Sequence, residues 1–260
     1  MQLGLTGKVA LVTGSSRGIG CGIALALAGE GCSLAVTGRD EKALDEVAAS
    51  IRASGAKPLV VPLDLRETSA ATALVNAVQS ELGGLDILVN NAGATKRGEF
   101  AALSDADWQD GFALKFFAHV RLARAAWPLL KARHGSLVTI GGTSGRKPSA
   151  SFTIGSSVNA ACAAFTKALA DLGKHDGVQV NCIHPSLVDT DRQRRRIAAE
   201  IERTGRSEAD IRQQFCREMG TTRFGTPQDV ADLVCFIVSQ RGSWLQGATI
   251  DLDGGEIPVL

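Results

Sequence analysis

The chain has 260 residues, 45% of them hydrophobic, which is enough for one large α/β domain over residues 1–260 with a sizeable core. Its 28 basic and 27 acidic side chains nearly cancel, so the overall charge argues against nucleic acid and against an anionic membrane as partners. No apolar run reaches transmembrane length and Met1-Gln2-Leu3-Gly4 lacks the pattern of a secretion signal, so we expect a cytoplasmic protein.

The first predicted strand begins at Val9 and leads through a glycine-rich turn into an apolar helical pattern. In the turn, Gly14 can adopt a backbone conformation closed to other residues, Gly18 lets the main chain approach a ligand, and Gly20 lets the helix pack closely on the strand. The free N–H groups and the positive dipole end of the helix then suit a pyrophosphate. Three glycines alone are weak support, but a strand before them and a helix after them predict a nucleotide site.

Strand and helix patterns then alternate along the chain. Strands are predicted at 33–37, 59–61, 86–90, 136–140, 178–183 and 249–252, and helices at 41–54, 70–82, 156–172 and 229–238. Ser104 and Asp107 resemble a capping box that opens a further, long helix running towards Pro128. This alternation predicts a single-domain, Rossmann-type α/β fold: a doubly wound parallel sheet with helices on both faces and ligands at the carboxyl ends of its strands.

A polar segment over residues 191–219 interrupts the alternation. Its arginines are Arg192, Arg194, Arg195, Arg196, Arg203, Arg206, Arg212 and Arg217. A long insertion after a strand is where a lid over a ligand would lie, and a pair of solvated surface helices is the open alternative. If the segment is a lid, its arginines favour an anionic substrate.

The cysteines and histidines show no metal-binding pattern. Six cysteines are scattered without paired spacing, mostly in apolar patterns, so we expect reduced thiols that act as small core residues. The four histidines have neither the spacing nor the clustering of zinc ligands, and no metal site is predicted.

Several motifs together resemble the short-chain dehydrogenase/reductase family over nearly the whole chain. They are Thr13-Gly14-x-x-x-Gly18-x-Gly20, Asp64-Leu65, Asn90-Asn91-Ala92-Gly93, Asn181-x-Ile183-x-Pro185 with Thr190, Gly225-x-Pro227-x-Asp229-Val230-Ala231 and Asp253-Gly254-Gly255. Ser186 departs from the glycine that the family usually has there. The resemblance implies an oligomer, a dimer or a tetramer, built on the helices that start near Ser104 and Ser156. It also implies a dinucleotide held by Gly14, Ser16, Arg17, Gly18, Ile19, Gly20, Arg39, Asp64, Leu65, Asn91, Ala92, Gly93, Pro185 and Thr190.

Charge at the end of the second strand favours NADP(H) over NAD(H). Members of the family that prefer NAD carry an acidic residue there, which binds the ribose hydroxyls and repels a 2′-phosphate. This chain has Gly38 followed by Arg39, and Arg17 in the glycine turn supplies a second guanidinium on the same side. The two arginines can clamp the 2′-phosphate, and the open alternative is that either is a surface residue without a ligand.

The catalytic half of the family pattern is missing. The family's chemistry resembles acid–base catalysis by a tyrosine with a lysine four residues on, a serine and an asparagine, and this chain contains no tyrosine. Alignment on Phe165-Thr166-Lys167 places Gly155 at the tyrosine position, Asn159 at the lysine position and Gly142 at the serine position. Counting along the long helix from Trp108 puts Lys115 at the asparagine position. Lysine and asparagine are thus exchanged, and their side chains should face each other.

Two interpretations of this site stay open. In the first, Lys115 has a lowered pKa and serves as the general acid, and Thr143, Ser144, Ser156 or Ser157 supplies a hydroxyl group from a neighbouring position. In the second, Lys115 extends into solvent and the site is released from catalysis. His184 either exchanges protons near the nicotinamide or is a hydrogen-bonded loop histidine.

The leading hypothesis is an NADP(H)-binding oxidoreductase for a carbonyl or alcohol substrate, with Lys115, Asn159 and Thr143 in a non-standard catalytic site. A catalytically silent nucleotide-binding subunit, pairing with itself or with an active relative, is the alternative from a different class. A lyase or isomerase that uses the pocket without hydride transfer is the third hypothesis.

Overall fold

A parallel sheet of seven strands runs through the computed structural model, which describes residues 2–258. In sheet order the strands are β3 (Pro58–Pro62), β2 (Ser33–Gly38), β1 (Val9–Thr13), β4 (Ile87–Asn90), β5 (Ser136–Ile140), β6 (Gln179–Pro185) and β7 (Thr249–Leu252). The chain winds outward in one direction from β1 to β3 and in the other from β4 to β7. The carboxyl ends of β1 and β4 therefore border the crevice where ligands bind in this type of sheet.

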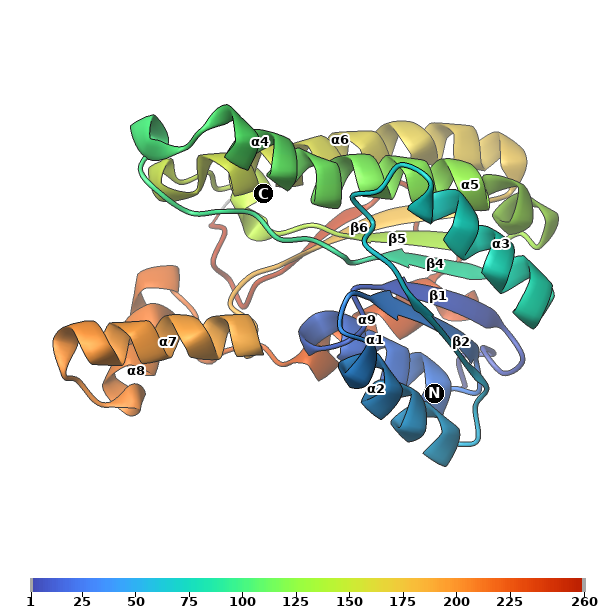
Figure 1. Cartoon of the computed structure of the whole chain (residues 1–260), viewed down its shortest axis with the longest axis horizontal. Coiled ribbons are helices and arrows are strands. Elements are labelled where there is room, and N and C mark those ends of the chain that lie inside the picture. Colours follow the sequence, from blue (N-terminus) through green and yellow to red (C-terminus); the bar gives the residue numbers. More distant parts are fainter. Residues whose placement is uncertain (1, 259–260) are drawn as a thin grey trace.

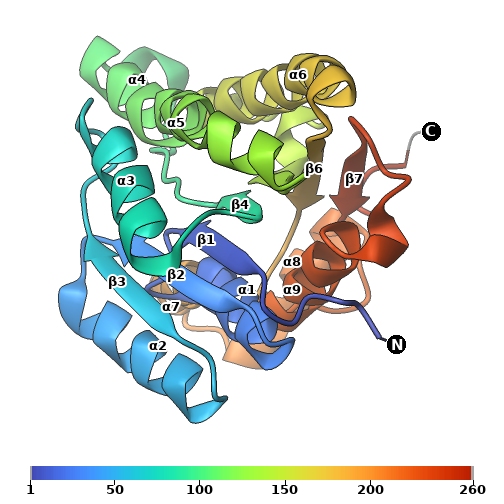
Figure 2. The same ribbon diagram turned by 90° about the vertical axis from the view of Figure 1, so that its right-hand side faces the viewer.

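Helices cover both faces of the sheet (Figure 2). Helices α1 (Gly18–Gly29), α2 (Glu41–Ala53) and α9 (Pro227–Ile237) pack on one face, and α3 (Ala70–Leu82), α5 (Ala118–Ala132) and α6 (Thr153–Asp176) pack on the other. Successive residues of β1 point to opposite faces: Ala10 and Val12 join the first core, whereas Val9 and Leu11 join the second. The predicted doubly wound α/β fold is confirmed.

The long helix after Ser104 is interrupted at a place that no residue pattern marks. Ser104 and Asp107 do form a capping box at the start of α4 (Asp105–Phe112). A π-helical turn over Ala113–Phe117 then joins α4 to α5, and Lys115 lies in its middle. The helical segment runs towards Pro128, as predicted, and continues past it, since Pro128 lies inside α5. π-Helical turns are rare in proteins, and those that occur are often found at functional sites.

The polar segment 191–219 forms two helices, α7 (Asp191–Thr204) and α8 (Glu208–Met219), which project from the sheet (Figure 1). Both helices are amphipathic, and their apolar sides form a separate small core of Leu187, Ile197, Ile211, Phe215 and Phe224. The segment is therefore a packed helical pair, and part of α7 lines the cleft described below, while Arg194, Arg203 and Arg212 are paired with carboxylates.

The cysteines are free thiols, as expected. Burial raises the pKa of Cys32, Cys182 and Cys235 to about 12, so these thiols stay protonated and inert at neutral pH. Within residues 2–258, no helix is both long enough and apolar enough to cross a bilayer.

Candidate active site

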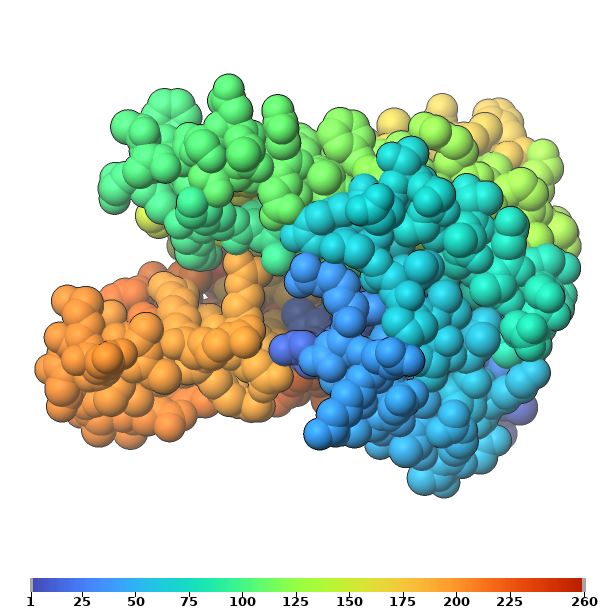
Figure 3. All heavy atoms as spheres, viewed as in Figure 1, coloured from blue at the N-terminus to red at the C-terminus, as the bar shows by residue number. Residues whose placement is uncertain are grey.

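A large cleft of about 1510 Å³ opens at the carboxyl ends of the strands. In Figure 3 it is the hollow between the orange α7–α8 pair and the green α4 region. All residues predicted for the cofactor and for catalysis line this cleft: Gly14, Ser16, Arg17, Gly18, Ile19, Gly20, Arg39, Asp64, Leu65, Asn91, Ala92, Gly93, Lys115, Thr143, Asn159, Pro185 and Thr190. The fold thus brings together residues that lie up to 176 positions apart, from Gly14 to Thr190.

The glycine turn between β1 and α1 leaves room for a ligand. Gly14 and Gly18 have φ of +64° and +58°, a region that favours glycine. A Cβ at Gly20 would collide with the carbonyl oxygen of Gly14, so α1 approaches the turn closely. Arg17 at the N-cap makes no capping hydrogen bond through its side chain and the first turn of α1 has no acidic residue, so the free N–H groups there fit a dinucleotide's pyrophosphate.

The side chain of Thr13 joins this turn to the end of β4. Its Oγ1 accepts hydrogen bonds from the backbone N of Asn91 (2.9 Å) and of Ala92 (3.0 Å) and donates one to Val89 O (3.2 Å). In return, Asn91 Nδ2 donates to Thr13 O at 2.8 Å and to Gly14 O at 3.2 Å. The floor of the cleft is therefore fixed by a threonine for which the sequence suggested no role beyond its place in the motif.

Arg17 and Arg39 lie at the mouth of the cleft, each beside a carboxylate. Arg17 Nη2 is 2.8 Å from Asp40 Oδ2, and Arg39 Nη1 is 3.8 Å from Asp64 Oδ2. Their side chains are 48% and 66% exposed, and exposed ion pairs of this kind are weak enough to yield to a phosphate. The arginines are thus placed beside carboxylates, and remain accessible to a ligand.

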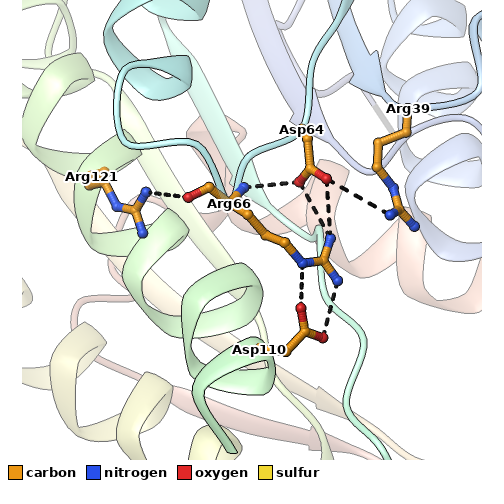
Figure 4. A network of polar contacts seen from close by, with 5 residues as sticks. All are labelled: Arg39, Asp64, Arg66, Asp110 and Arg121. Carbon is orange, nitrogen blue, oxygen red and sulfur yellow. Dashed lines mark hydrogen bonds and ion pairs between the residues drawn. The ribbon is translucent and has the colours of Figure 1, made fainter. Parts of the chain in front are cut away.

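Asp64 belongs to a wider polar network (Figure 4). Arg66 Nε and Nη2 donate to the two carboxylate oxygens of Asp110 on α4, at 2.6 and 3.2 Å, and its Nη1 donates to Asp64 Oδ1 at 3.3 Å. Arg121 on α5 donates to Arg66 O at 3.0 Å. The loop after β3, whose Asp64 and Leu65 are expected to hold the dinucleotide, is therefore anchored to the helical segment that carries Lys115.

Lys115 points into the cleft. Its Nζ donates to Gly141 O, at the end of β5, at 2.9 Å. The stem passes so close to Gly93 that a Cβ there would lie 2.7 Å from Lys115 Cδ. Burial lowers the pKa of the Lys115 ammonium below its ordinary value. The interpretation in which this side chain extends into solvent is therefore wrong.

Asn159 lines the same cleft as Lys115, but the two side chains bond to different partners. Its Nδ2 donates to Ser144 Oγ at 2.8 Å, which leaves the Ser144 hydroxyl proton free for another acceptor. A Cβ at Gly142 would lie 2.8 Å from Asn159 Nδ2, so Asn159 occupies the space beside that glycine. Of the four hydroxyls considered, Thr143 and Ser144 line the cleft, and Ser156 is buried in α6, where it accepts from Ser149 N at 3.4 Å.

An aromatic ring packs on Gly155. A Cβ at this position would collide with the ring of Phe152, which lines the cleft and is itself buried. The guanidinium of Arg97 stacks on the same ring at 3.7 Å from its centroid. Neither Phe152 nor Arg97 was expected from the sequence, because Arg97 lies in an irregular loop and no motif marks a contact between the two.

His184 lies in strand β6 rather than in a loop, and the expectation of a hydrogen-bonded loop histidine is wrong. The residue is fully buried, and neither ring nitrogen has a hydrogen-bond partner in the described part of the chain. Its Nδ1 lies 3.6 Å from Asp251 Oδ1. Burial, with the nearby charges of Lys115 and Arg146, lowers the pKa of His184 to about 4, so the ring is neutral at pH 7.

Acidification should destabilise the fold through two buried histidines. Burial lowers the pKa of His119 to about 3 and that of His184 to about 4, against 6.5 in the unfolded chain. Below pH 6.5 the unfolded chain takes up protons that the folded chain does not, so the free energy of unfolding should fall with pH by about 1.4 kcal/mol per unit for each histidine, down to its folded pKa. Urea unfolding at pH 7, 6 and 5 measures this slope.

In a His184→Asn variant the free energy of unfolding should depend less steeply on pH, because one of the two buried histidines is gone. His175→Gln, at an exposed position on α6, is the matched control and should keep the full slope. Equal slopes in the wild type and in His184→Asn would contradict the assignment.

Ser186, the departure from the family's usual glycine, has a structural partner. Its hydroxyl donates to the carboxylate of Glu256, and Lys147 Nζ lies 3.8 Å from the same carboxylate. Glu256 is 7% exposed and lines the cleft. The serine thus ties the loop after β6 to the segment after β7.

The doubly wound parallel sheet, with a glycine turn and a free helix terminus at its switch point, defines the class of Rossmann-type α/β proteins. The profile of the short chain dehydrogenase family matches residues 8–201, and the chain belongs to that family.

Three relatives resemble the chain over nearly its full length. It is 30% identical over 253 residues to a 3-oxoacyl-(acyl-carrier-protein) reductase of Escherichia coli (strain K12), covering 96% of this chain and 97% of that protein. L-Sorbose reductase from Gluconobacter frateurii, solved with NADPH and L-sorbose, superposes with a TM-score of 0.96 at 32% identity over 100% of both chains. A 7α-hydroxysteroid dehydrogenase solved with NADH superposes with a TM-score of 0.90 at 28% identity, covering 100% of this chain and 98% of that one.

Proposed function

We propose that the chain is an NADP(H)-dependent reductase of carbonyl substrates with a non-standard active site, in which Lys115 donates the proton. NADPH, when bound, supplies a hydride, and the chain must then supply a proton to the carbonyl oxygen. The observation that carries the proposal is the ammonium of Lys115, which reaches into the cleft from a π-helical turn and is anchored on Gly141 O. An amine desolvated in this way is a better acid than an exposed lysine.

Hydroxyl groups beside Lys115 would hold the carbonyl oxygen. Thr143 and Ser144 line the cleft, and the bond from Asn159 Nδ2 orients Ser144 with its proton free. In this proposal Lys115 gives the proton, Thr143 or Ser144 donates a hydrogen bond to the same oxygen, and Asn159 positions Ser144. The site then works without the tyrosine that the chain lacks.

The choice of NADP(H) rests on Arg17 and Arg39. Solved relatives hold NADPH in one case and NADH in another, so the family alone does not decide the cofactor. Here β2 ends at Gly38, and the following Arg39 and the turn residue Arg17 both line the mouth of the cleft. Two guanidinium groups favour a ligand with a 2′-phosphate.

Arg39→Ala should weaken NADPH binding about 10- to 100-fold, the effect of losing a charge-assisted hydrogen bond, and leave NADH binding nearly unchanged. Fluorescence titration of both dinucleotides measures the difference. The matched control is Lys42→Ala on the exposed face of α2, which should change neither affinity. An equal loss for NADPH and NADH would rule out recognition of the 2′-phosphate by Arg39.

Turnover is tested by mixing the protein with NADPH and a panel of ketones and acyl thioesters and following NADPH absorbance in a stopped-flow instrument. Oxidation of NADPH with at least one carbonyl compound supports the proposal. A protein that binds neither NADPH nor NADH would overturn it.

One observation favours a second candidate, a dinucleotide-binding subunit without redox activity. The ring of Phe152 packs on Gly155, the position where the family resemblance implies the tyrosine, so no side chain fits there. NADPH binding without oxidation across the carbonyl panel would support this candidate.

Either function is compatible with self-association, which we propose to involve the outer faces of α5 and α6. Phe117, next to α5, and Leu172, on α6, are 50% and 47% exposed, which is high for large apolar side chains. Light scattering should give the mass of two or four chains, or of a mixed assembly if an active relative is present. The mass of one chain would contradict the proposal.

A further inference from the structure

Three arginines meet at the end of the cleft beneath the α7–α8 pair. Arg97 comes from the loop after β4, and Arg192 and Arg196 come from α7; all three line the cleft. Among the described residues none of them lies within 4 Å of a carboxylate oxygen. By contrast, Arg194 on the same helix pairs with Asp189 and Asp191. These three guanidinium groups are therefore on the cleft side of the helical pair. Arg195, which also has no carboxylate within 4 Å in the described part of the chain, lines the cleft as well and acts on Arg192.

Contacts other than ion pairs hold these arginines in place. Arg97 stacks on Phe152 at 3.7 Å, Arg196 stacks on Phe215 at 4.4 Å, and Arg192 Nη2 donates to Thr95 O at 3.3 Å. Stacking on a ring leaves the N–H edge of a guanidinium free for a ligand, and that edge matches a carboxylate or a phosphate. The donors are thus arranged before any anion arrives.

The three positive charges repel one another. Burial, with the charges of Arg196 and Arg192, lowers the pKa of Arg97 to about 10. Burial also lowers the pKa of Arg192, and the charges of Arg195 and Arg196 lower it further. Like charges held together cost free energy that a bound anion offsets.

The acidic residues that line this part of the cleft are engaged elsewhere. Asp191 Oδ1 is 2.9 Å from Arg194 Nη1, Glu218 accepts from Gln214 Nε2 at 2.6 Å, and Glu256 accepts from Ser186. These carboxylates line the same cleft, but within residues 2–258 none of them lies within 4 Å of the guanidinium groups of Arg97, Arg192 or Arg196.

Gly155 is linked to this cluster through Phe152. The ring that supports Arg97 lies where any Cβ at position 155 would be, so the ring and a side chain at 155 exclude each other. A glycine at this position is thus a requirement for the place that Arg97 occupies.

We propose that the substrate carries an oxyanion group, a carboxylate or a phosphate monoester, which Arg97, Arg192 and Arg196 bind, and that Gly155 exists to let Phe152 support Arg97. This inference rests on the proposed function, because the reducible carbonyl and the oxyanion would belong to one molecule in the same cleft. The substrate class is then an oxo acid or a phosphorylated ketone.

The experiment titrates the full-length protein with malonate and with inorganic phosphate by calorimetry, at constant ionic strength and in the presence of saturating NADP⁺. Arg97→Ala and Arg192→Ala should each weaken binding of at least one probe about tenfold or more. Arg194→Ala, with its guanidinium paired on the same helix, should leave the affinities unchanged. Tighter binding of malonate would indicate a carboxylate substrate, and tighter binding of phosphate a phosphate ester.

Gly155→Ala tests the role of the glycine. It should displace the Phe152 ring and weaken binding of the probe as strongly as Arg97→Ala does, while the NADPH titration stays unchanged. If this variant does not fold, Phe152→Leu removes the ring without crowding position 155. This second variant should weaken binding of the probe to the same extent.

Unchanged probe affinity in both Arg97→Ala and Arg192→Ala would overturn the inference. Loss of probe binding in Arg39→Ala alone would also overturn it, because the anion would then occupy the cofactor site. Failure of the proposed function would give a different result. If the protein binds the probes through Arg97 but binds no dinucleotide, the anion site is supported and the proposal of a reductase is wrong.

Discussion

Replacing Lys115 with methionine is expected to lower the rate of NADPH oxidation about 10²- to 10⁴-fold, the contribution typical of a positioned general acid. Methionine retains an unbranched side chain that can follow the path past Gly93, but it carries no proton to donate. The measurement is a single-turnover stopped-flow trace of NADPH absorbance at saturating substrate. NADPH affinity should change little, because the phosphate-binding residues lie at the glycine turn and at Arg39.

The pH profile separates an acid from a structural lysine. Burial lowers the pKa of Lys115 below its ordinary value of 10.5, and only the protonated form donates. The reduction rate should therefore be level at low pH and fall as the pH rises through this lowered pKa. This fall in rate at high pH, the alkaline limb of the profile, should be absent in Lys115→Met.

Lys96→Met is the matched control. Lys96 is exposed and pairs with Asp107 at 2.9 Å, away from the cleft lining. This variant should keep both the rate and the alkaline limb. Full turnover in Lys115→Met, or an unchanged limb, would show that another group supplies the proton.

The fold and the glycine turn at one end of the cleft could be predicted from the sequence because they depend on local patterns. A strand, a glycine turn and a helix are adjacent in the chain, and the periodicity of the other elements marks their buried faces. The positions that counting assigned to Lys115 and Asn159 do lie in the same cleft. What counting could not predict is their partners, since Gly141 O and Ser144 Oγ are reached only once β5 and α6 pack together.

The substrate end depends on contacts between distant and irregular segments. The π-helical turn has no residue pattern of its own, and a helix of ordinary pitch would aim Lys115 elsewhere. The stack of Arg97 on Phe152 joins two loops and needs the missing side chain of Gly155. His184 was expected in a loop because the predicted strand ended at residue 183, yet β6 continues through Pro185 beside β7.

Thr13→Val should lower the free energy of unfolding by about 1–3 kcal/mol for the buried N–H of Ala92, which loses its acceptor, with a smaller further loss from the part-buried N–H of Asn91. The Thr13 hydroxyl is fully buried and accepts from Asn91 N and Ala92 N. Valine has nearly the same shape, so the packing of β1 is kept and the loss is that of the hydrogen bonds. Urea unfolding measures it, and NADPH affinity should fall as well, since the same bonds hold the turn at Gly14.

Thr37→Val is the control that makes this result interpretable. Thr37 lies opposite Thr13 in the β1–β2 register and is equally buried, but within residues 2–258 its Oγ1 has no hydrogen-bond partner. Removing an unpaired hydroxyl should leave stability unchanged or raise it. If Thr13→Val were no more destabilising than Thr37→Val, the role assigned to Thr13 would be wrong. Both threonines end an apolar strand and look alike in the sequence, and only the neighbouring end of β4 gives one of them hydrogen bonds that shape the cleft.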